Sequence, residues 1–337
     1  MLTQIANRDS RPSFWPRVRE FAVPPSMIET ATARRHVGDW AGACAAAGID
    51  VDLNLRSLAR THGRELAAHV RADLRHLAPD LLRWHMPRIA PDGLLRPGLT
   101  IALARYETAG PNDACRLHLV VRTPPAWADA GQRISLTLWD GSPSGAGVHR
   151  PPHPHPHPSR RFRLDLHRHL WDARRTDELR IRSGADRLSA SARPARDQVP
   201  AGPDQLGTVR QERPCAVDRW AAEAGILLHA EGRATGTVVV RFGARHRLLL
   251  EVTADGAEPP LFRIAPASRE HGPTALPVLP DAATWVLPDL ELLRTGSIEA
   301  DRLHPLVASA LVPDHAPTDR PRVPDRAGRT RLVECRG

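Results

Sequence analysis

The chain has 337 residues, a formal net charge of +9 and an apolar share of 41%. That length is sufficient for two domains of ordinary size. All 47 of its Lys and Arg positions are arginine, which excludes a Lys-bearing phosphate loop and Schiff-base chemistry.

Composition also bears on compartment and partners. No run of about 18 apolar residues is present, so we expect no membrane span, and the N-terminus has no apolar signal-peptide core, so we expect a cytoplasmic protein. The cysteines stand too far apart to predict disulfides or zinc ligands. Arginine has GC-rich codons, so a solvated charged surface is favoured over a nucleic-acid footprint.

The clearest periodicity lies between Arg34 and Arg88 and predicts a helical hairpin or a three-helix unit. Either Asp52 or Asn54 can cap the long helix, because a short polar side chain accepts bonds from free backbone N–H groups. Pro79 ends that helix and suits the first turn of the next one, over residues 80–86. The predicted buried stripe, with residues three or four apart, comprises Leu55, Leu58, His62, Leu66, Val70, Leu74, Leu77 and Leu81.

A β-rich segment follows the helices. Residues 99–106, 116–122 and 133–139 each alternate between apolar and polar side chains and are bounded by Gly, Pro and Asp clusters. This pattern predicts an antiparallel meander of three strands.

Parts of this organisation recur later in the chain. Val37–Ala41 is echoed by Val217–Ala221, and Arg116–Val121 by Arg247–Val252. Trp171, Leu179 and Arg180 match Trp285, Leu293 and Arg294 at the same internal spacing. The echoes keep their order, which favours a duplicated unit. Two unrelated segments of similar composition are the alternative.

We therefore predict an α+β fold with two related units, each a small antiparallel sheet packed with helices. The expected domains are an N-terminal arm over residues 1–24, a first unit over 25–182, a linker over 183–213, a second, trimmed unit over 214–312 and a disordered tail over 313–337. Phe14, Trp15 and Phe21 are expected to dock the arm onto the body.

The candidate site lies within residues 162–172. If residues 160–169 form a strand, then Asp165, His167 and His169 share one face. A carboxylate beside two imidazoles could bind a metal, with Asp172 as a third ligand, or perform acid–base chemistry. The alternative interpretation is the solvated side of an edge strand. The His-Pro tract at residues 151–158 predicts a polyproline II spacer, in which neighbouring histidines point to different sides.

The stretches GDWAGACAAAGIDVDL, DLRHLAPDLLRWHMPR and LHRHLWDARRTDELR resemble a group of uncharacterised proteins from GC-rich bacteria. The resemblance covers most of residues 25–312. It implies no activity and therefore no catalytic or binding residue.

Catalytic motifs are absent from the sequence, so we expect a non-enzymatic interaction or scaffold protein that binds another protein and holds neither cofactor nor metal. One alternative is a metal-assisted or acid–base enzyme centred on Asp165, His167 and His169. The other is an arginine-driven nucleic-acid binder.

Overall fold

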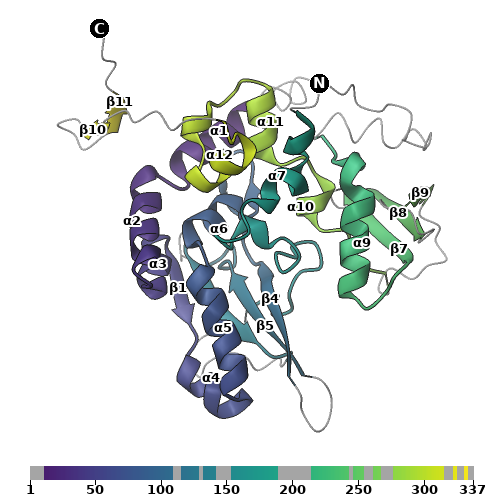
Figure 1. Ribbon diagram of the computed structural model, residues 1–337, viewed down its shortest axis with the longest axis horizontal. Helices are drawn as coiled ribbons and strands as arrows, with labels where there is room; N and C mark the ends of the chain where they lie inside the picture. The colour runs from purple at the N-terminus through teal and green to yellow at the C-terminus, as the bar shows by residue number, and fades with distance from the viewer. Residues whose placement is uncertain are drawn as a thin grey trace.

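The helices and sheets of the protein form two units of the predicted α+β class, which lie side by side in Figure 1. The computed structural model describes residues 11–108, 115–128, 132–141, 153–188, 214–242, 246–253, 261–266, 276–314, 322–324 and 330–332. Each unit has its own hydrophobic core.

Three short helices open the chain: α1 (Arg11–Phe21), α2 (Pro25–His36) and α3 (Trp40–Ala46). The arm predicted over residues 1–24 thus contains a helix, which docks through the buried side chains of Phe14 and Val18. Phe21 was also expected to dock, but it stays 69% exposed at the last residue of α1.

The predicted long helix is divided into α4 (Leu55–His62) and α5 (Arg64–His76), and α6 (Pro79–His85) follows. The break lies at Gly63, whose φ of +93° is accessible to glycine but strained for other residues. Asn54 caps α4, since its Oδ1 accepts the N–H groups of Arg56 and Ser57 at 2.9 and 3.0 Å. The stripe is buried at Leu58 before the break and at Leu66, Val70, Leu74, Leu77 and Leu81 after it, whereas Leu55 and His62 are half-buried.

The first sheet has the strand order β1-β6-β5-β4, with β1 at Ile49–Asp52, β4 at Thr100–Thr108, β5 at Cys115–Arg122 and β6 at Ile134–Trp139. Strands β4, β5 and β6 form the predicted antiparallel meander. The expectation of a purely antiparallel sheet is wrong, because β1 pairs with β6 in parallel and occupies its outer edge. A small hairpin, β2 (Arg88–Ile89) and β3 (Leu94–Leu95), lies between α6 and β4.

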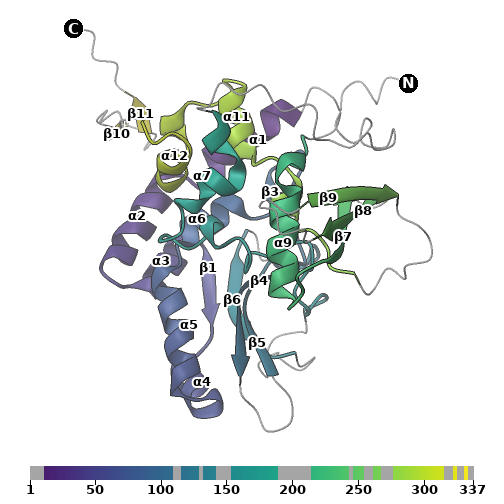
Figure 2. The ribbon, with the colours of Figure 1, turned by 45° about the vertical axis from the view of Figure 1, so that its right-hand side comes forward.

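The second unit consists of α9 (Trp220–Ala230), which follows the 3-10 turn η4 (Val217–Arg219), and a three-stranded antiparallel sheet. Its strands are β7 (Gly236–Phe242), β8 (His246–Thr253) and β9 (Leu261–Pro266). Both ribbon views show α9 between the two sheets (Figures 1 and 2). Helix α9 therefore lies on the side of the second unit that faces the first sheet.

The chain then returns to the first unit. After α10 (Asp281–Thr284), the helices α11 (Pro288–Arg294) and α12 (Pro305–Leu311) bury Leu290, Leu292 and Val307 in the first core, with η5 (Ala300–Arg302) between them. This differs from the predicted second unit over 214–312, because the second core extends only to Trp285.

The predicted linker and tail are described only in part. Ser183 is the last residue of α7 (Glu178–Ser183), and Ala185 of η2 (Ala185–Leu188) is buried in the first core. Residues 189–213 of the predicted linker lie outside the described part. The predicted disordered tail contains an antiparallel pair, β10 (Arg322–Pro324) with β11 (Thr330–Leu332).

The two units make three similar backbone contacts. In the first unit, Ala78 N–H donates to Trp171 O at 2.8 Å and Ala173 N–H donates to His76 O at 2.9 Å. In the second unit, Ala216 N–H donates to Thr284 O at 3.1 Å and Val286 N–H donates to Pro214 O at 3.0 Å. The third contact is a parallel bridge, between Ala102 and Arg163 in the first unit and between Val239 and Val278 in the second. In this comparison α9 corresponds to α6 rather than to α3, the helix of the Trp40 echo. Duplication of the unit stays a prediction.

Candidate functional site

The predicted site segment, residues 162–172, is a chain of turns rather than a strand. Its strand-like contacts are two isolated bridges, a parallel one from Arg163 to Ala102 and an antiparallel one from Asp172 to Leu77, with η1 (Arg168–Leu170) between them. Asp165, His167 and His169 therefore do not alternate along one strand face. Their side chains and that of Asp172 are nevertheless buried, so the solvated-edge interpretation does not describe them either.

Arginines neutralise both carboxylates of the predicted site. Arg163 Nε lies 2.8 Å from Asp165 Oδ1, and Arg105 Nε lies 3.0 Å from Asp165 Oδ2. Arg168 donates to Asp172 Oδ2 at 3.1 Å. These carboxylates are occupied as ion-pair acceptors, which leaves them poorly suited to bind a metal.

His167 belongs to a buried network that joins the two units. Its Nδ1 lies 2.9 Å from Arg163 O, and its Nε2 lies 3.2 Å from Oε2 of Glu223 on α9. Arg182 donates to both oxygens of Glu223, at 2.5 and 2.6 Å. Burial alone would raise the pKa of Glu223, but the hydrogen bonds of His167 and Arg182 outweigh it and lower that pKa to about 2.

The His169 ring centroid lies 5.7 Å from that of His167. Burial, followed by the charges of His167 and Arg182, lowers the pKa of His169 well below its usual value, so the ring is neutral. Its Nδ1 makes no hydrogen bond in the described part of the chain. No group of three or more His, Cys, Asp or Glu residues suited to a metal ion occurs among the described residues.

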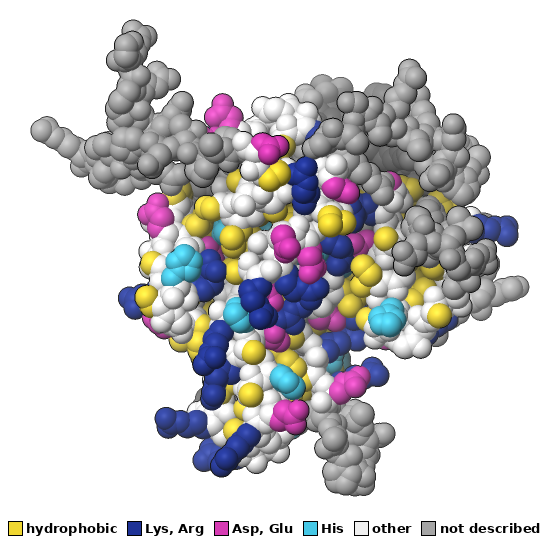
Figure 3. Space-filling model, viewed as in Figure 1, with side chains coloured by type: hydrophobic (Ala, Val, Ile, Leu, Met, Phe, Trp, Pro, Cys, Tyr) yellow, Lys and Arg dark blue, Asp and Glu magenta, His cyan; other side chains and the backbone are white. Residues whose placement is uncertain are grey.

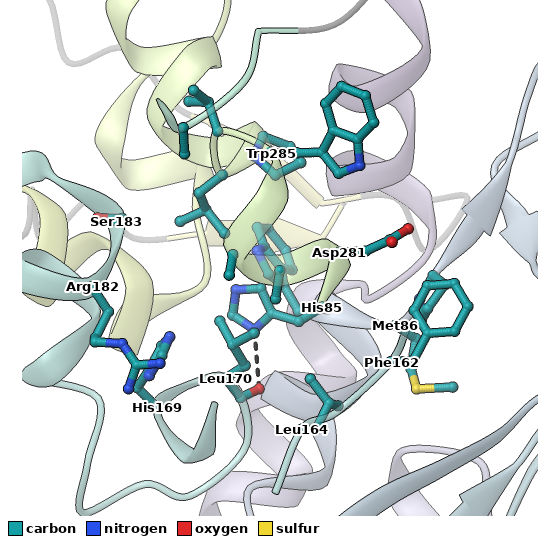
Figure 4. A pocket seen from close by; sticks show the side chains of 18 of the residues that line it. His85, Met86, Phe162, Leu164, His169, Leu170, Arg182, Ser183, Asp281 and Trp285 are labelled. Atoms are coloured by element: carbon teal, nitrogen blue, oxygen red, sulfur yellow. Dashed lines mark hydrogen bonds between the residues drawn. The ribbon is translucent and has the colours of Figure 1, made fainter. Parts of the chain in front are cut away.

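A cavity of about 190 Å³ lies beside this network, where the two units meet. It is bounded by the end of α6, residues 161–164 of the first unit, α7, and residues 281–288 (Figure 4). Of the four predicted site residues, His169 alone lines the cavity. Much of the wall is apolar, with contributions from Trp84, Met86, Ile101, Phe162, Leu164, Leu170, Leu179, Trp285 and Leu287.

Arginines make up most of the charge on the cavity wall, and several have carboxylate partners. The Arg19 guanidinium lies 2.6 Å from Asp289, Arg161 contacts Asp281 at 3.0 and 2.7 Å, and Arg182 binds Glu223 as described. Arg88 and Arg96 have no carboxylate within ion-pair distance in the described part of the chain. These two guanidinium groups are thus the uncompensated charges of the cavity.

Arg88 is half-buried and donates to two backbone carbonyls, Gly93 O and Arg83 O, both at 2.9 Å. Its Nε makes no hydrogen bond with the residues that the structure describes. Burial, followed by the positive charges of Arg19 and Arg83, lowers the pKa of Arg88 to about 9. The Arg96 guanidinium lies 6.0 Å from the centroid of the Phe162 ring, on the same cavity wall.

His85 provides a neutral polar group on the wall. Its Nδ1 lies 3.1 Å from both Leu81 O and Leu170 O (Figure 4). Two carbonyl acceptors require the hydrogen on Nδ1, which leaves Nε2 as an acceptor, and no donor among the described residues reaches Nε2. Burial lowers the pKa of His85 to about 4, although Asp289 opposes the shift.

Sequence reasoning identified His169 but missed His85 and Arg88. Both stand in the stretch RWHMPR, where the periodicity indicates only the end of a helix. No spacing or motif marks either residue, because the cavity is formed by segments that are distant in sequence.

The buried histidines predict a loss of stability in acid. His85 and His118 have pKa values of about 4, below the usual 6.5, so the unfolded chain binds more protons between these values. The free energy of unfolding should keep its highest value above pH 6.5. It should fall from there towards pH 4, by about 1.4 kcal/mol per pH unit for each such histidine. Urea titrations at pH 7.5, 6 and 5 measure this slope.

His85→Gln should make the slope shallower, whereas His69→Gln, at an exposed position, should leave it unchanged. An identical slope in the parent and in His85→Gln would show that His85 is not held neutral by the fold.

Comparison of the chain with protein-family models, curated proteins and solved structures finds no match. The resemblance to proteins of GC-rich bacteria therefore stays a prediction. Among the described residues, no helix combines the length and apolar character needed to cross a membrane.

Proposed function

We propose that the chain is a non-enzymatic binding protein that holds a small anion with an apolar body in the cavity between its units. The observation that carries this proposal is Arg88, a half-buried guanidinium on an apolar cavity wall that has no carboxylate partner in the described chain. A buried charge is costly unless it is paired, so an anionic ligand would supply the missing counter-charge.

The other polar groups of the wall support an anion with a defined orientation. In the described chain Arg88 Nε makes no hydrogen bond, but it is itself buried, so the anion would contact the Nη groups of Arg88 and also Arg96, a second charge without a carboxylate partner on the same wall. A guanidinium group suits the oxygens of a carboxylate or phosphate, because its donors form a planar fork.

The apolar wall and the size of the cavity limit the rest of the ligand. Trp84, Phe162 and Trp285 provide aromatic contact surface. The volume of about 190 Å³ lies below the range of roughly 300–1,000 Å³ that is usual for drug-sized ligands. The ligand class is therefore a carboxylate or phosphate ester with a small apolar body, such as one aromatic ring.

Binding is favoured over catalysis because the titratable groups of the site are held in one protonation state. Glu223 is kept charged, while His85 and His169 are kept neutral. A general acid or base works best with a pKa near the working pH. On the face that Figure 3 shows, arginines are interspersed with acidic and apolar side chains, so that face gives no support to nucleic-acid binding.

The proposal predicts that benzoate and phenyl phosphate stabilise the parent protein against heat, whereas the neutral benzamide does not. A ligand at 100 times its Kd raises the free energy of unfolding by about 2.7 kcal/mol. Arg88→Gln should weaken binding of both anions at least tenfold, equivalent to about 1.4 kcal/mol. Arg88→Lys should retain part of the affinity, because it keeps the charge but loses the planar fork.

Arg71→Gln, at an exposed position of α5, is the matched control and should bind as the parent does. Isothermal titration calorimetry at constant ionic strength measures each affinity. Equal affinities of the parent and Arg88→Gln for both anions would refute the assignment of Arg88 as the anion contact.

A further inference from the structure

A second cavity, of about 410 Å³, lies between the first sheet and the second unit. Its floor is a row of side chains across three strands, Arg105 of β4, His118 of β5 and Trp139 of β6. The strand register pairs Arg105 with His118 and His118 with Trp139, so the three side chains share one face of the sheet. The opposite face carries the neighbouring core residues Leu117 and Leu119.

The His-Pro tract, predicted to be a spacer, contributes His157 and Pro158 to the lining of this cavity. His153 Nε2 lies 3.0 Å from Thr123 O, and Thr100 Oγ1 donates to His155 O at 2.6 Å. These bonds attach the tract to the sheet and place the His157 ring centroid 5.4 Å from that of Trp139. The tract is therefore a structural part of a binding surface.

Three aromatic rings contact one another in a row along the cavity, with Trp139 between His118 and His157. His118 and Trp139 have ring centroids 5.3 Å apart at an interplanar angle of 69°, and Trp139 meets His157 at 80°. The edge-to-face contacts are favourable for the rings themselves. They leave an indole and two imidazoles on the lining of one cavity, which is typical of sites that bind planar rings.

Two polar atoms of the floor are unsatisfied. Trp139 Nε1 and His118 Nδ1 are buried and have no hydrogen-bond partner in the described chain. His118 is only 7% exposed, and a buried indole N–H usually finds an acceptor. Both atoms have almost no accessible surface, so a heterocyclic ring in the cavity would reach them once the indole and imidazole rings turn toward it.

The rim of the cavity is cationic. Arg105, Arg116, Arg160, Arg163 and Arg233 line it, and Glu231 is the one acidic residue among the lining residues. Glu231 is itself bound by Arg163 at 2.9 Å. Arg116 and Arg233 are exposed and have no carboxylate within ion-pair distance in the described chain. The rim thus offers guanidinium donors to an anionic group attached to the ring.

We infer that this second cavity binds a nucleoside monophosphate, with the base beside Trp139 and the phosphate at Arg116 and Arg233. The base would pack on the aromatic floor and, as the rings of Trp139 and His118 turn toward it, would satisfy Trp139 Nε1 and His118 Nδ1 through its ring nitrogens and exocyclic groups. The phosphate would take its hydrogen bonds from the arginine rim. This site is separate from the cavity at Arg88, and it requires no ligand there.

Isothermal titration calorimetry with the four ribonucleoside 5′-monophosphates tests the assignment, with adenosine and inorganic phosphate as the separate halves of the ligand. At least one monophosphate should bind the parent, and the corresponding half-ligands should bind at least tenfold more weakly. Trp139→Phe retains the ring but removes the N–H, so it should weaken binding at least tenfold. Arg233→Gln, an exposed change that spares the core, should weaken it at least threefold.

Two controls separate this site from the rest of the molecule. Trp127→Phe changes a tryptophan that is 72% exposed, and Arg88→Gln changes the first cavity. Both should bind the monophosphate as the parent does. Failure of all four monophosphates to bind, or equal binding by the parent, Trp139→Phe and Arg233→Gln, would overturn the inference. Loss of binding in Arg88→Gln alone would assign the nucleotide to the first cavity and equally overturn it.

Discussion

Asp289→Ala is expected to lower the free energy of unfolding by about 3–5 kcal/mol, the range for breaking a buried ion pair by removing one partner. Arg19 Nη2 lies 2.6 Å from Asp289 Oδ2, and the two side chains are 2% and 0% exposed. Trp84 Nε1 donates to the other oxygen at 3.0 Å. The variant would leave a buried guanidinium unpaired and the indole N–H without an acceptor.

Urea denaturation measures the effect, and Asp301→Ala, at an exposed position of η5, is the matched control. Asp289→Asn keeps an acceptor for Trp84 but removes the charge, so it should lie between the parent and the alanine variant. The double variant Arg19→Met/Asp289→Ala should recover part of the loss, since no unpaired charge remains. An unfolding midpoint for Asp289→Ala equal to that of Asp301→Ala would contradict a buried pair.

The same ion pair illustrates what sequence reasoning could not reach. Its residues are 270 positions apart, one in α1 and one in α11, and neither belongs to a periodic pattern that points to the other. The N-terminal segment was therefore interpreted as an arm rather than as a helix fixed to the body. The packing of α11 and α12 in the first core was not predicted either, because it also joins segments that are distant in sequence.

Features that depend on near neighbours were predictable. The meander of β4, β5 and β6 follows from apolar alternation within each strand, and the cap at Asn54 from the residue type just before α4. The break at Gly63 was missed because the leucine spacing continues through it. Apolar spacing indicates which residues are buried, and because α4 and α5 bury the same stripe, the spacing does not show where one helix ends and the next begins.

The candidate site was predictable only as a set of residue types. His167 and His169 were singled out, but the strand that would have aligned them does not form. Glu223, the carboxylate nearest His167 Nε2, comes from α9 in the other unit. The partners of a buried polar residue are set by tertiary packing, which one sequence does not reveal when the contact joins distant segments.

The final prediction concerns Leu74, in the middle of the stripe of α5. The side chain is fully buried in the first core, together with Val70 one turn earlier and Leu66 two turns earlier. Leu74→Ala removes buried methyl groups and leaves a cavity that the close-packed surroundings fill only in part, so it should cost about 2–5 kcal/mol. Thermal and urea unfolding measure the loss.

Leu94→Ala is the matched control, because Leu94 lies on β3 with 43% of its surface exposed. Its cost should stay within about 0.5 kcal/mol, as for most surface substitutions. The difference between the two leucine variants therefore reports burial rather than the chemistry of the replacement. Equal unfolding midpoints for the two variants would mean that the face of α5 at Leu74 is not packed against the first sheet, and that the helix stripe has another contact surface.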